Sequence, residues 1–192
     1  EFTLVAVADY VPPKRPGNTV SNLSSTRALR DVTTKYGGEY HAAAVGEVNV
    51  VEKMKAVKAV IGGEGNGGVI LPELHYGRDA LVGIALFLSH LANCGKQIST
   101  LRKTYPDYQM SKTKLDRTPD IDLNKIFAAL GEKYRNEQIN TEDGLKIDFD
   151  SGWVHLRPSN TEPIIRVYSE SNSIVVAENL AKKIIQDIQT FR

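Results

Sequence analysis

The 192-residue sequence has a single cysteine, Cys94, so it can form no internal disulfide and offers no cysteine cluster for zinc. It also lacks an apolar run long enough to span a bilayer and any stretch that resembles a signal peptide. Neither sign of charge dominates, because 24 Lys and Arg residues face 23 Asp and Glu residues. We therefore expect a cytoplasmic protein, with neither a nucleic acid nor a membrane as its partner.

The order of helix and strand patterns predicts two domains. Residues 1–97 alternate the two patterns, which favours an α/β domain with a mixed, mostly parallel sheet whose ligands gather beyond the carboxyl ends of the strands. Residues 98–120 show no sustained period and are interpreted as a linker or hinge. Residues 121–192 combine a helix, several short strands and a final amphipathic helix, which predicts a smaller α+β domain.

Residues 157–166 place two arginines around the loop Pro-Ser-Asn-Thr-Glu-Pro. A phosphate dianion binds planar guanidinium groups, short polar side chains and backbone N–H groups, and this segment supplies all three. The period-two pattern before the loop predicts a strand with Trp153, His155 and Arg157 on one face. An ordinary hairpin with solvated arginines is an equal alternative from composition alone. The phosphate-binding candidates are Arg157, Ser159, Asn160, Thr161 and Arg166.

Residues 62–68 read Gly-Gly-Glu-Gly-Asn-Gly-Gly. They satisfy G-x-G-x-x-G, but the extended, proline-closed segment that follows cannot open the helix that dinucleotide binding requires. The loop also lacks the Gly-Lys-Ser/Thr of a Walker A motif. It suits sugar hydroxyls, which a carboxylate and an amide can bind while glycines admit the ring closely; a mobile loop with a solvated glutamate is the alternative. The sugar-binding candidates are Glu64, Gly65, Asn66 and Gly67.

Three further residues are weaker candidates for ligand contact. Gly46 precedes an expected helix, where backbone N–H groups can face an anion or a hydroxyl. His75 could orient a substrate, and Arg78 could bind a ligand or pair locally. His41 and His155 lie in strand-like stretches without carboxylates at metal-ligand spacing, so the sequence predicts no metal site in this chain.

Taken together, the two loops resemble those of the α-D-phosphohexomutase superfamily, which includes phosphoglucomutase, phosphomannomutase and phosphoglucosamine mutase. Residues 157–166 are similar to the phosphate-binding loop of the family's fourth domain, and 62–68 to the sugar-specificity loop of its third domain, commonly written G-E-x-S-G-H. Asn66 stands where serine is usual and Gly68 where histidine is usual. This form resembles a branch with bifunctional phosphomannomutase/phosphoglucomutases and archaeal-type phosphoglucosamine mutases.

The resemblance implies an enzyme that interconverts hexose 1-phosphate and 6-phosphate through a phosphoserine and a bisphosphorylated sugar. Family members carry the phosphoserine in a T/S-A-S-H-N-P type loop and hold Mg²⁺ in a D-x-D-x-D loop, and neither pattern occurs in this sequence. The chain is thus expected to be the substrate-binding carboxyl half of a four-domain enzyme, without a catalytic residue of its own. Its expected partners are a hexose phosphate and the missing N-terminal domains, with Mg²⁺ and a hexose bisphosphate activator in the complete enzyme.

A stand-alone phosphosugar-binding module without catalysis is the alternative from a different functional class. Such a module would carry the same two loops. It would differ from half of an enzyme by binding hexose phosphates tightly on its own, whereas an open half-site should bind them feebly.

Overall fold

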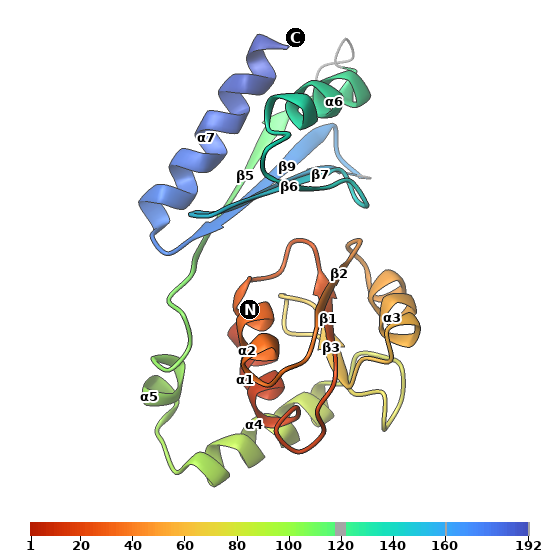
Figure 1. Cartoon of the computed structure of the whole chain (residues 1–192), viewed down its shortest axis with the longest axis vertical. Helices are drawn as coiled ribbons and strands as arrows, with labels where there is room; N and C mark the ends of the chain where they lie inside the picture. Colours follow the sequence, from red (N-terminus) through yellow and green to blue (C-terminus); the bar gives the residue numbers. More distant parts are fainter. Residues whose placement is uncertain (118–121, 160, 192) are drawn as a thin grey trace. The chain divides into compact units, whose positions relative to one another are not determined.

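The computed structural model describes residues 1–117, 122–159 and 161–191 (Figure 1). The chain divides into two compact units, Glu1–Pro106 and Asp107–Arg192. Among the described helices, none combines the length and the apolar character that crossing a membrane would require.

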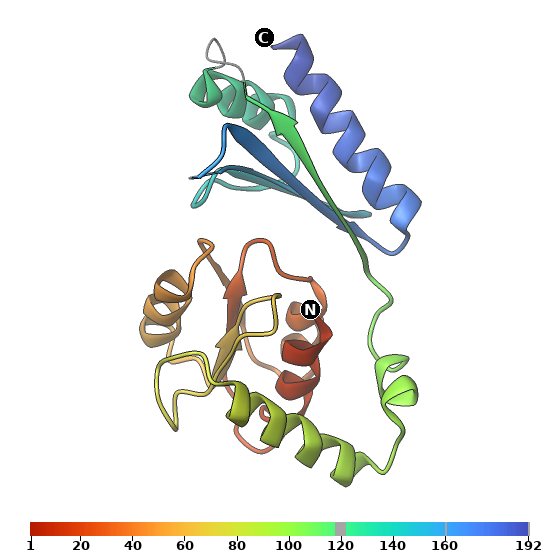
Figure 2. The same cartoon turned by 180° about the vertical axis from the view of Figure 1, so that it is seen from behind.

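The first unit is an α/β domain built on a four-stranded sheet of order β2-β1-β3-β4. Strand β1 runs parallel to both β2 and β3, and β4 returns antiparallel to β3. Helix α3 lies on one face of the sheet and α1 and α2 on the other (Figure 2). The elements are α1 (Phe2–Tyr10), β1 (Thr19–Asn22), α2 (Ala28–Lys35), β2 (Tyr40–Ala43), α3 (Glu47–Ala56), β3 (Ile61–Gly63), β4 (Val69–Ile70), α4 (Ala80–Cys94) and α5 (Ile98–Arg102).

Every residue of β1 is buried, because helices cover both faces of the sheet at this central strand. Val20 of β1 packs with Val50 and Met54 of α3 on one side of the sheet. Helix α1 is mostly apolar and its residues Leu4 to Ala8 are buried. The predicted mixed, mostly parallel sheet is confirmed, and its carboxyl edge carries the loops that follow β1, β2 and β3.

Helix α4 begins at the cap residue Asp79 and ends at Gly95, and it contains no Asp, Glu, Lys or Arg. It packs against α1 and β4, yet Leu81, Ile84 and Leu88 are 77%, 54% and 56% exposed. These three residues follow helical spacing and form one apolar stripe on the helix. Within the described ranges the stripe faces solvent.

The second unit is an α+β domain with a five-stranded antiparallel sheet of order β5-β9-β8-β7-β6. Helices α6 and α7 cover one face of that sheet (Figures 1 and 2). The elements are β5 (Gln109–Asp116), α6 (Leu123–Lys133), β6 (Gln138–Asn140), β7 (Leu145–Phe149), β8 (Gly152–Pro158), β9 (Ile164–Ser171) and α7 (Ile174–Thr190).

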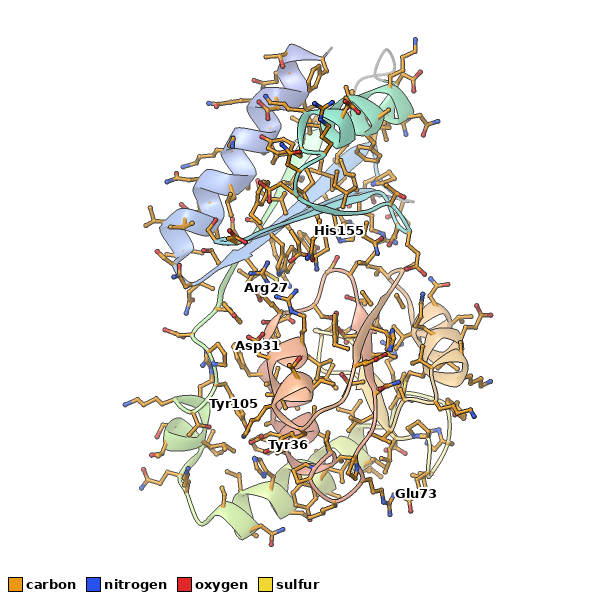
Figure 3. The ribbon with its side chains drawn as sticks, viewed as in Figure 1. Arg27, Asp31, Tyr36, Glu73, Tyr105 and His155 are labelled. Carbon is orange, nitrogen blue, oxygen red and sulfur yellow. The ribbon has the colours of Figure 1, made fainter. Side chains whose placement is uncertain are left out.

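Alternation along β8 decides which side chains meet the helices. Val154 and Leu156 join the core between sheet and helices, together with Ile184 of α7. Trp153, His155 and Arg157 therefore lie on the opposite face, as the sequence pattern predicts; Figure 3 shows His155 on the side of the sheet away from α6 and α7.

The structure differs from the sequence interpretation in the range 98–120. Instead of an irregular linker, this range contains α5 and strand β5, and the two units divide between Pro106 and Asp107. Strand β5 lies at the edge of the sheet, where lysine side chains are favoured. Leu115 is its side chain that packs on the core, so the segment shows no apolar period in the sequence. Residues 118–121, at the predicted junction, lie outside the described residues.

Candidate functional site

The carboxyl ends of β1, β2 and β3 meet at one edge of the first sheet, since these strands are parallel. Asn22 ends β1, Gly46 follows β2, and Glu64 follows β3. Ligands of open α/β sheets bind beyond this edge. The sequence candidates Gly46 and Glu64 are therefore brought together by the topology, although they are 18 residues apart in the chain.

The Glu64 carboxylate is the centre of this edge and is 4% exposed. Its Oε1 accepts from Asn22 Nδ2 at 2.8 Å and from the Gly46 backbone N–H at 3.3 Å. Its Oε2 accepts from Arg78 Nη1 at 3.4 Å and from Asn66 Nδ2 at 3.5 Å. Buried carboxylates need such donors. Because three of the four contacts are long, a ligand hydroxyl that approached the group could compete with them.

Hydrogen bonds shape residues 64–68 into a turn rather than an open loop. The Glu64 N–H donates to the Gly68 carbonyl at 2.9 Å, and the Gly67 N–H donates to the Glu64 carbonyl at 3.0 Å. Gly67 has φ of 102°, a conformation that favours glycine. The Gly65 N–H donates to Ser25 Oγ at 2.8 Å, which ties the turn to the segment after β1. The glycines thus position the Glu64 carboxylate.

Arg78 is clamped by a second carboxylate, Glu47, which opens helix α3. The backbone N–H and Nε of Arg78 donate to Glu47 at 2.9 and 2.8 Å. The Arg78 backbone N–H, followed by its guanidinium, holds the pKa of the Glu47 carboxyl below its usual range. A Cβ at Gly68 would lie 2.5 Å from Arg78 Cδ, so the Arg78 stem occupies the space into which a side chain at position 68 would point.

His75 lies in the segment before α4 and contacts the cap of that helix. Its Nε2 lies 3.1 Å from Asp79 Oδ2, and Asp79 Oδ1 in turn accepts from the Val82 N–H at 3.0 Å as the helix cap. These contacts hold His75 beside the helix cap, so it remains a weaker candidate for ligand contact.

In the second unit, three cationic side chains lie in one row across the sheet. Arg157 of β8 pairs directly with Arg166 of β9, and Arg166 pairs directly with Lys114 of β5. Like charges at opposed positions destabilise a sheet. Asp143 Oδ2 lies 2.8 Å from Arg157 Nε, and Glu162 Oε2 lies 3.1 Å from Arg166 Nη2. Two carboxylates thus oppose three cations, which leaves this strand end attractive to an anion.

The loop beside this row is closed by the backbone. The Ser159 N–H donates to the Ile164 carbonyl at 2.9 Å. The Thr161 N–H donates to Ser159 Oγ at 3.4 Å, and the two hydroxyl oxygens lie 3.5 Å apart. The structure therefore brings Arg157, Arg166 and both hydroxyl groups to one strand end. Asn160 lies outside the described residues.

His155 is a buried neutral group behind this strand end. Burial lowers its pKa to about 4, against an opposing effect of the hydrogen bond to the Asp143 carbonyl. That bond joins His155 Nε2 to the carbonyl oxygen at 2.7 Å. A carbonyl only accepts, so Nε2 carries the proton of the neutral ring.

The low pKa of His155 predicts a pH-dependent stability of the second unit. Unfolding releases the ring to bind a proton near pH 6.5, so between about pH 6.5 and 4 the unfolded state binds more protons. The free energy of unfolding should fall by about 2 kcal/mol from about pH 7 to pH 5 through this group. Urea unfolding followed by fluorescence of Trp153, the single tryptophan, measures it. His155→Gln should flatten the dependence by that amount; an unchanged slope would contradict the assignment.

The sequence patterns did not identify several residues of these sites. Asn22 ends β1 and Ser25 follows it, and both could have been found by applying the strand-end rule to that strand as well as to β3. The Asp-Gly pair at Asp143 indicates a turn in the sequence, but the contact of Asp143 with Arg157 depends on the register of β7 and β8. Lys114 depends on the pairing of an edge strand that the sequence does not indicate.

No metal centre is found in the part of the chain that the structure describes: no group of three or more His, Cys, Asp or Glu side chains there could hold an ion. The two clusters around Glu64 and Arg157 are instead suited to hydrogen-bonding a neutral polyol and an anion, respectively.

Comparison with protein families gives two matches that follow each other along the chain. Residues 1–108 match "Phosphoglucomutase/phosphomannomutase, alpha/beta/alpha domain III", and residues 113–186 match "Phosphoglucomutase/phosphomannomutase, C-terminal domain". The two matched ranges lie almost wholly within one compact unit each.

Two archaeal relatives are similar over most of this chain. A phosphoglucomutase/phosphomannomutase of Thermococcus kodakarensis is 37% identical over 89% of the chain and 38% of its own length. A phosphoglucosamine/phosphogalactosamine mutase of Sulfurisphaera tokodaii is 34% identical over 91% of the chain and 39% of its own length. The chain thus spans about two fifths of the length of the curated relatives it matches.

The fold also matches solved structures. A phosphoglucomutase/phosphomannomutase family protein of Burkholderia thailandensis superposes with a TM-score of 0.77 at 21% identity, covering 98% of this chain and 41% of that protein.

Proposed function

This chain belongs to the phosphoglucomutase/phosphomannomutase family, and on that premise we propose that it is the substrate-binding half of a phosphohexomutase. In this proposal the complete enzyme interconverts hexose 1-phosphate and 6-phosphate. The observation that carries it is the direct cross-strand pairing of Arg157 with Arg166 beside a loop of hydroxyl groups, an arrangement that an unliganded hairpin would not favour.

The Arg157 loop binds the phosphate that is not being transferred. Planar guanidinium groups bind a phosphate through two parallel N–H···O bonds, and each charge-assisted hydrogen bond contributes about 1.5–3 kcal/mol. The neighbouring hydroxyls of Ser159 and Thr161 add further donors. The proposed phosphate ligands are Arg157, Ser159, Asn160, Thr161 and Arg166.

The Glu64 turn binds the sugar. Glu64 accepts from vicinal hydroxyls, Asn66 offers both a donor and an acceptor, and Gly65 and Gly67 keep the approach open. Arg78 supports this proposal because its side chain reaches Glu64 and fills the space beside Gly68. Gly46 contributes a backbone N–H to the same cluster.

The phosphoryl chemistry is assigned to the domains that precede this half in longer family members. There a phosphoserine and Mg²⁺ transfer the phosphoryl group, with a hexose bisphosphate as activator. The described residues of this chain offer no cluster that fits the metal, so their proposed contribution is binding and orientation of the substrate. The relatives act on different hexose phosphates by name, and the proposal extends to hexose phosphates as a class.

Replacing Glu64 by glutamine tests the sugar-binding role. An amide keeps one acceptor but presents N–H groups toward Arg78, so it loses the charge-assisted acceptance of hydroxyls. In the complete enzyme we expect kcat/KM for glucose 1-phosphate to fall by about ten- to a hundred-fold.

Glu52→Gln is the matched control, because Glu52 is an exposed carboxylate on α3 of the same unit. It should leave kcat/KM unchanged. Equal effects of the two substitutions, or a fall that follows only from a lower melting temperature of Glu64→Gln, would count against the sugar-binding role.

A further inference from the structure

The Asn22 side chain, at the end of β1, is held in one orientation by its neighbours. Its Oδ1 accepts from the Ser24 backbone N–H at 3.1 Å and from Ser25 Oγ at 2.9 Å. Its Nδ2 donates to Glu64 Oε1 at 2.8 Å. A backbone N–H only donates and an ionised carboxylate only accepts, so these partners fix which side of the Asn22 amide faces Glu64.

Ser25 connects the same segment to the backbone of the Glu64 turn. Its Oγ donates to Asn22 Oδ1 and accepts from the Gly65 N–H at 2.8 Å. Asn22, Ser25 and Glu64 are 6%, 2% and 4% exposed, so water competes little for these bonds. The segment after β1 therefore holds Glu64 by its side chain and the following residue by its main chain.

The two oxygens of the Glu64 carboxylate are held unequally. Oε1 accepts the 2.8 Å bond from Asn22 and a longer one, at 3.3 Å, from the Gly46 N–H. The contacts of Oε2 measure 3.4 Å to Arg78 and 3.5 Å to Asn66, and both partners are side chains that solvent reaches. Oε1 is thus the anchored oxygen, and Oε2 has the weaker bonds that a ligand hydroxyl can replace.

We propose that Asn22 is a positioning residue for sugar binding, which anchors Glu64 Oε1 so that Oε2 is presented to a sugar hydroxyl. This inference rests on the proposed function, in which Glu64 binds the sugar. Asn22 acts through Glu64 and touches no substrate atom. A carboxylate that is already oriented loses less side-chain entropy when the sugar binds, and the binding is stronger for that reason.

Two substitutions separate this role from a purely structural one. Asn22→Ala removes every hydrogen bond of the side chain. Asn22→Asp keeps the shape and an acceptor for the residues that follow, but it replaces the donor by a carboxylate oxygen that repels Glu64. If Asn22 positions Glu64, both variants should bind glucose 1-phosphate about five-fold more weakly than the unmodified chain. Unchanged binding by Asn22→Asp would mean that Asn22 only shapes the segment after β1, and would overturn the proposal.

The dissociation constants are measured by NMR titration of the ¹⁵N-labelled chain, from the amide signals of residues 64–67. Inorganic phosphate, followed at Ser159 and Thr161, should bind equally to the unmodified chain and to both variants, because its proposed ligands belong to the second unit. A five-fold loss that appeared with inorganic phosphate as well would contradict a role specific to the sugar.

Asn18→Ala is the matched control, because Asn18 also uses both ends of its amide and lies just before the other end of β1. Its Nδ2 donates to the Val57 carbonyl at 3.1 Å, and its Oδ1 accepts from the Glu39 N–H at 3.1 Å. Asn18→Ala should lower the melting temperature much as Asn22→Ala does, yet leave the dissociation constant for glucose 1-phosphate unchanged. An equal loss of binding in this control would show that loosening β1 at either end is enough, which would overturn the positioning role.

The failure of the inference and that of the proposed function give different results. If Glu64→Gln loses binding while Asn22→Ala keeps it, only the positioning role fails. If glucose 1-phosphate shifts none of the amide signals of residues 64–67 in the unmodified chain, the sugar-binding role of Glu64 fails and the inference with it.

A measurement without ligand gives a second readout. The side-chain NH₂ signals of Asn22 should exchange slowly with water and lie apart from those of Asn124, which is exposed. Glu64→Ala removes the acceptor and should move the Asn22 signals toward those of exposed asparagines, whereas Glu52→Ala should leave them in place. Asn22 signals that already resemble those of Asn124 in the unmodified chain would overturn the proposal.

Discussion

Arg157→Ala should lower kcat/KM for hexose phosphates by about a hundred-fold or more in the complete enzyme. Two charge-assisted hydrogen bonds to one phosphate are lost together, and Arg166, which already pairs with Glu162, would be the remaining guanidinium beside the loop. Arg157→Lys should remain impaired, because an ammonium keeps the charge but cannot bind in bidentate geometry. Steady-state kinetics with glucose 1-phosphate measure both effects.

Two other arginines serve as comparisons. Arg135→Ala removes an exposed arginine from the same unit, with its partner Glu132 three residues away, and should change nothing. Arg78→Ala should cost far less than Arg157→Ala, since Arg78 already faces the carboxylates of Glu47 and Glu64. Equal losses for Arg78→Ala and Arg157→Ala would mean that the phosphate lies elsewhere.

The 192-residue chain alone should show no mutase turnover. In the proposed function the phosphoserine and the metal belong to domains that the chain does not include, and a half that only binds and orients the substrate cannot donate a phosphoryl group. The assay couples conversion of glucose 1-phosphate to detection of glucose 6-phosphate, in the presence of Mg²⁺ and the bisphosphate activator.

A family member that contains all four domains provides the positive control for this assay. The same chain with Arg157→Ala, purified identically, reports contaminating enzyme from the host. Reproducible turnover by the unmodified chain, absent from its Arg157→Ala counterpart, would refute the division of binding and chemistry between two halves.

Much of the fold follows from local sequence patterns. The alternation in β8 was enough to place Val154 and Leu156 on one face and Arg157 on the other, and the structure shows that the first face is the core side. The alternating helix and strand patterns of the first unit predicted the parallel strands, and hence the edge at which Glu64 lies. These features depend on periodicity and on burial, which a sequence displays directly.

Other features depend on long-range pairing and could not be derived from the sequence. Strand β5 carries mostly polar side chains and is placed in the sheet by pairing with β9, so its pattern resembled a linker. The bond from Asn22 to Glu64 joins residues 42 positions apart, and the approach of Asp143 to Arg157 requires the register of β7 and β8. Such contacts are set by the packed tertiary structure rather than by local preference.

The most direct test of the central claim is an NMR titration of the ¹⁵N-labelled chain with glucose 1-phosphate. We expect glucose 1-phosphate to shift the amide signals of Ser159 and Thr161 and those of residues 64–67, and inorganic phosphate alone to shift only the first group. Shifts confined to other surfaces would contradict the claim that these loops bind a hexose phosphate. An absence of shifts in both loops at the highest ligand concentrations would contradict it equally.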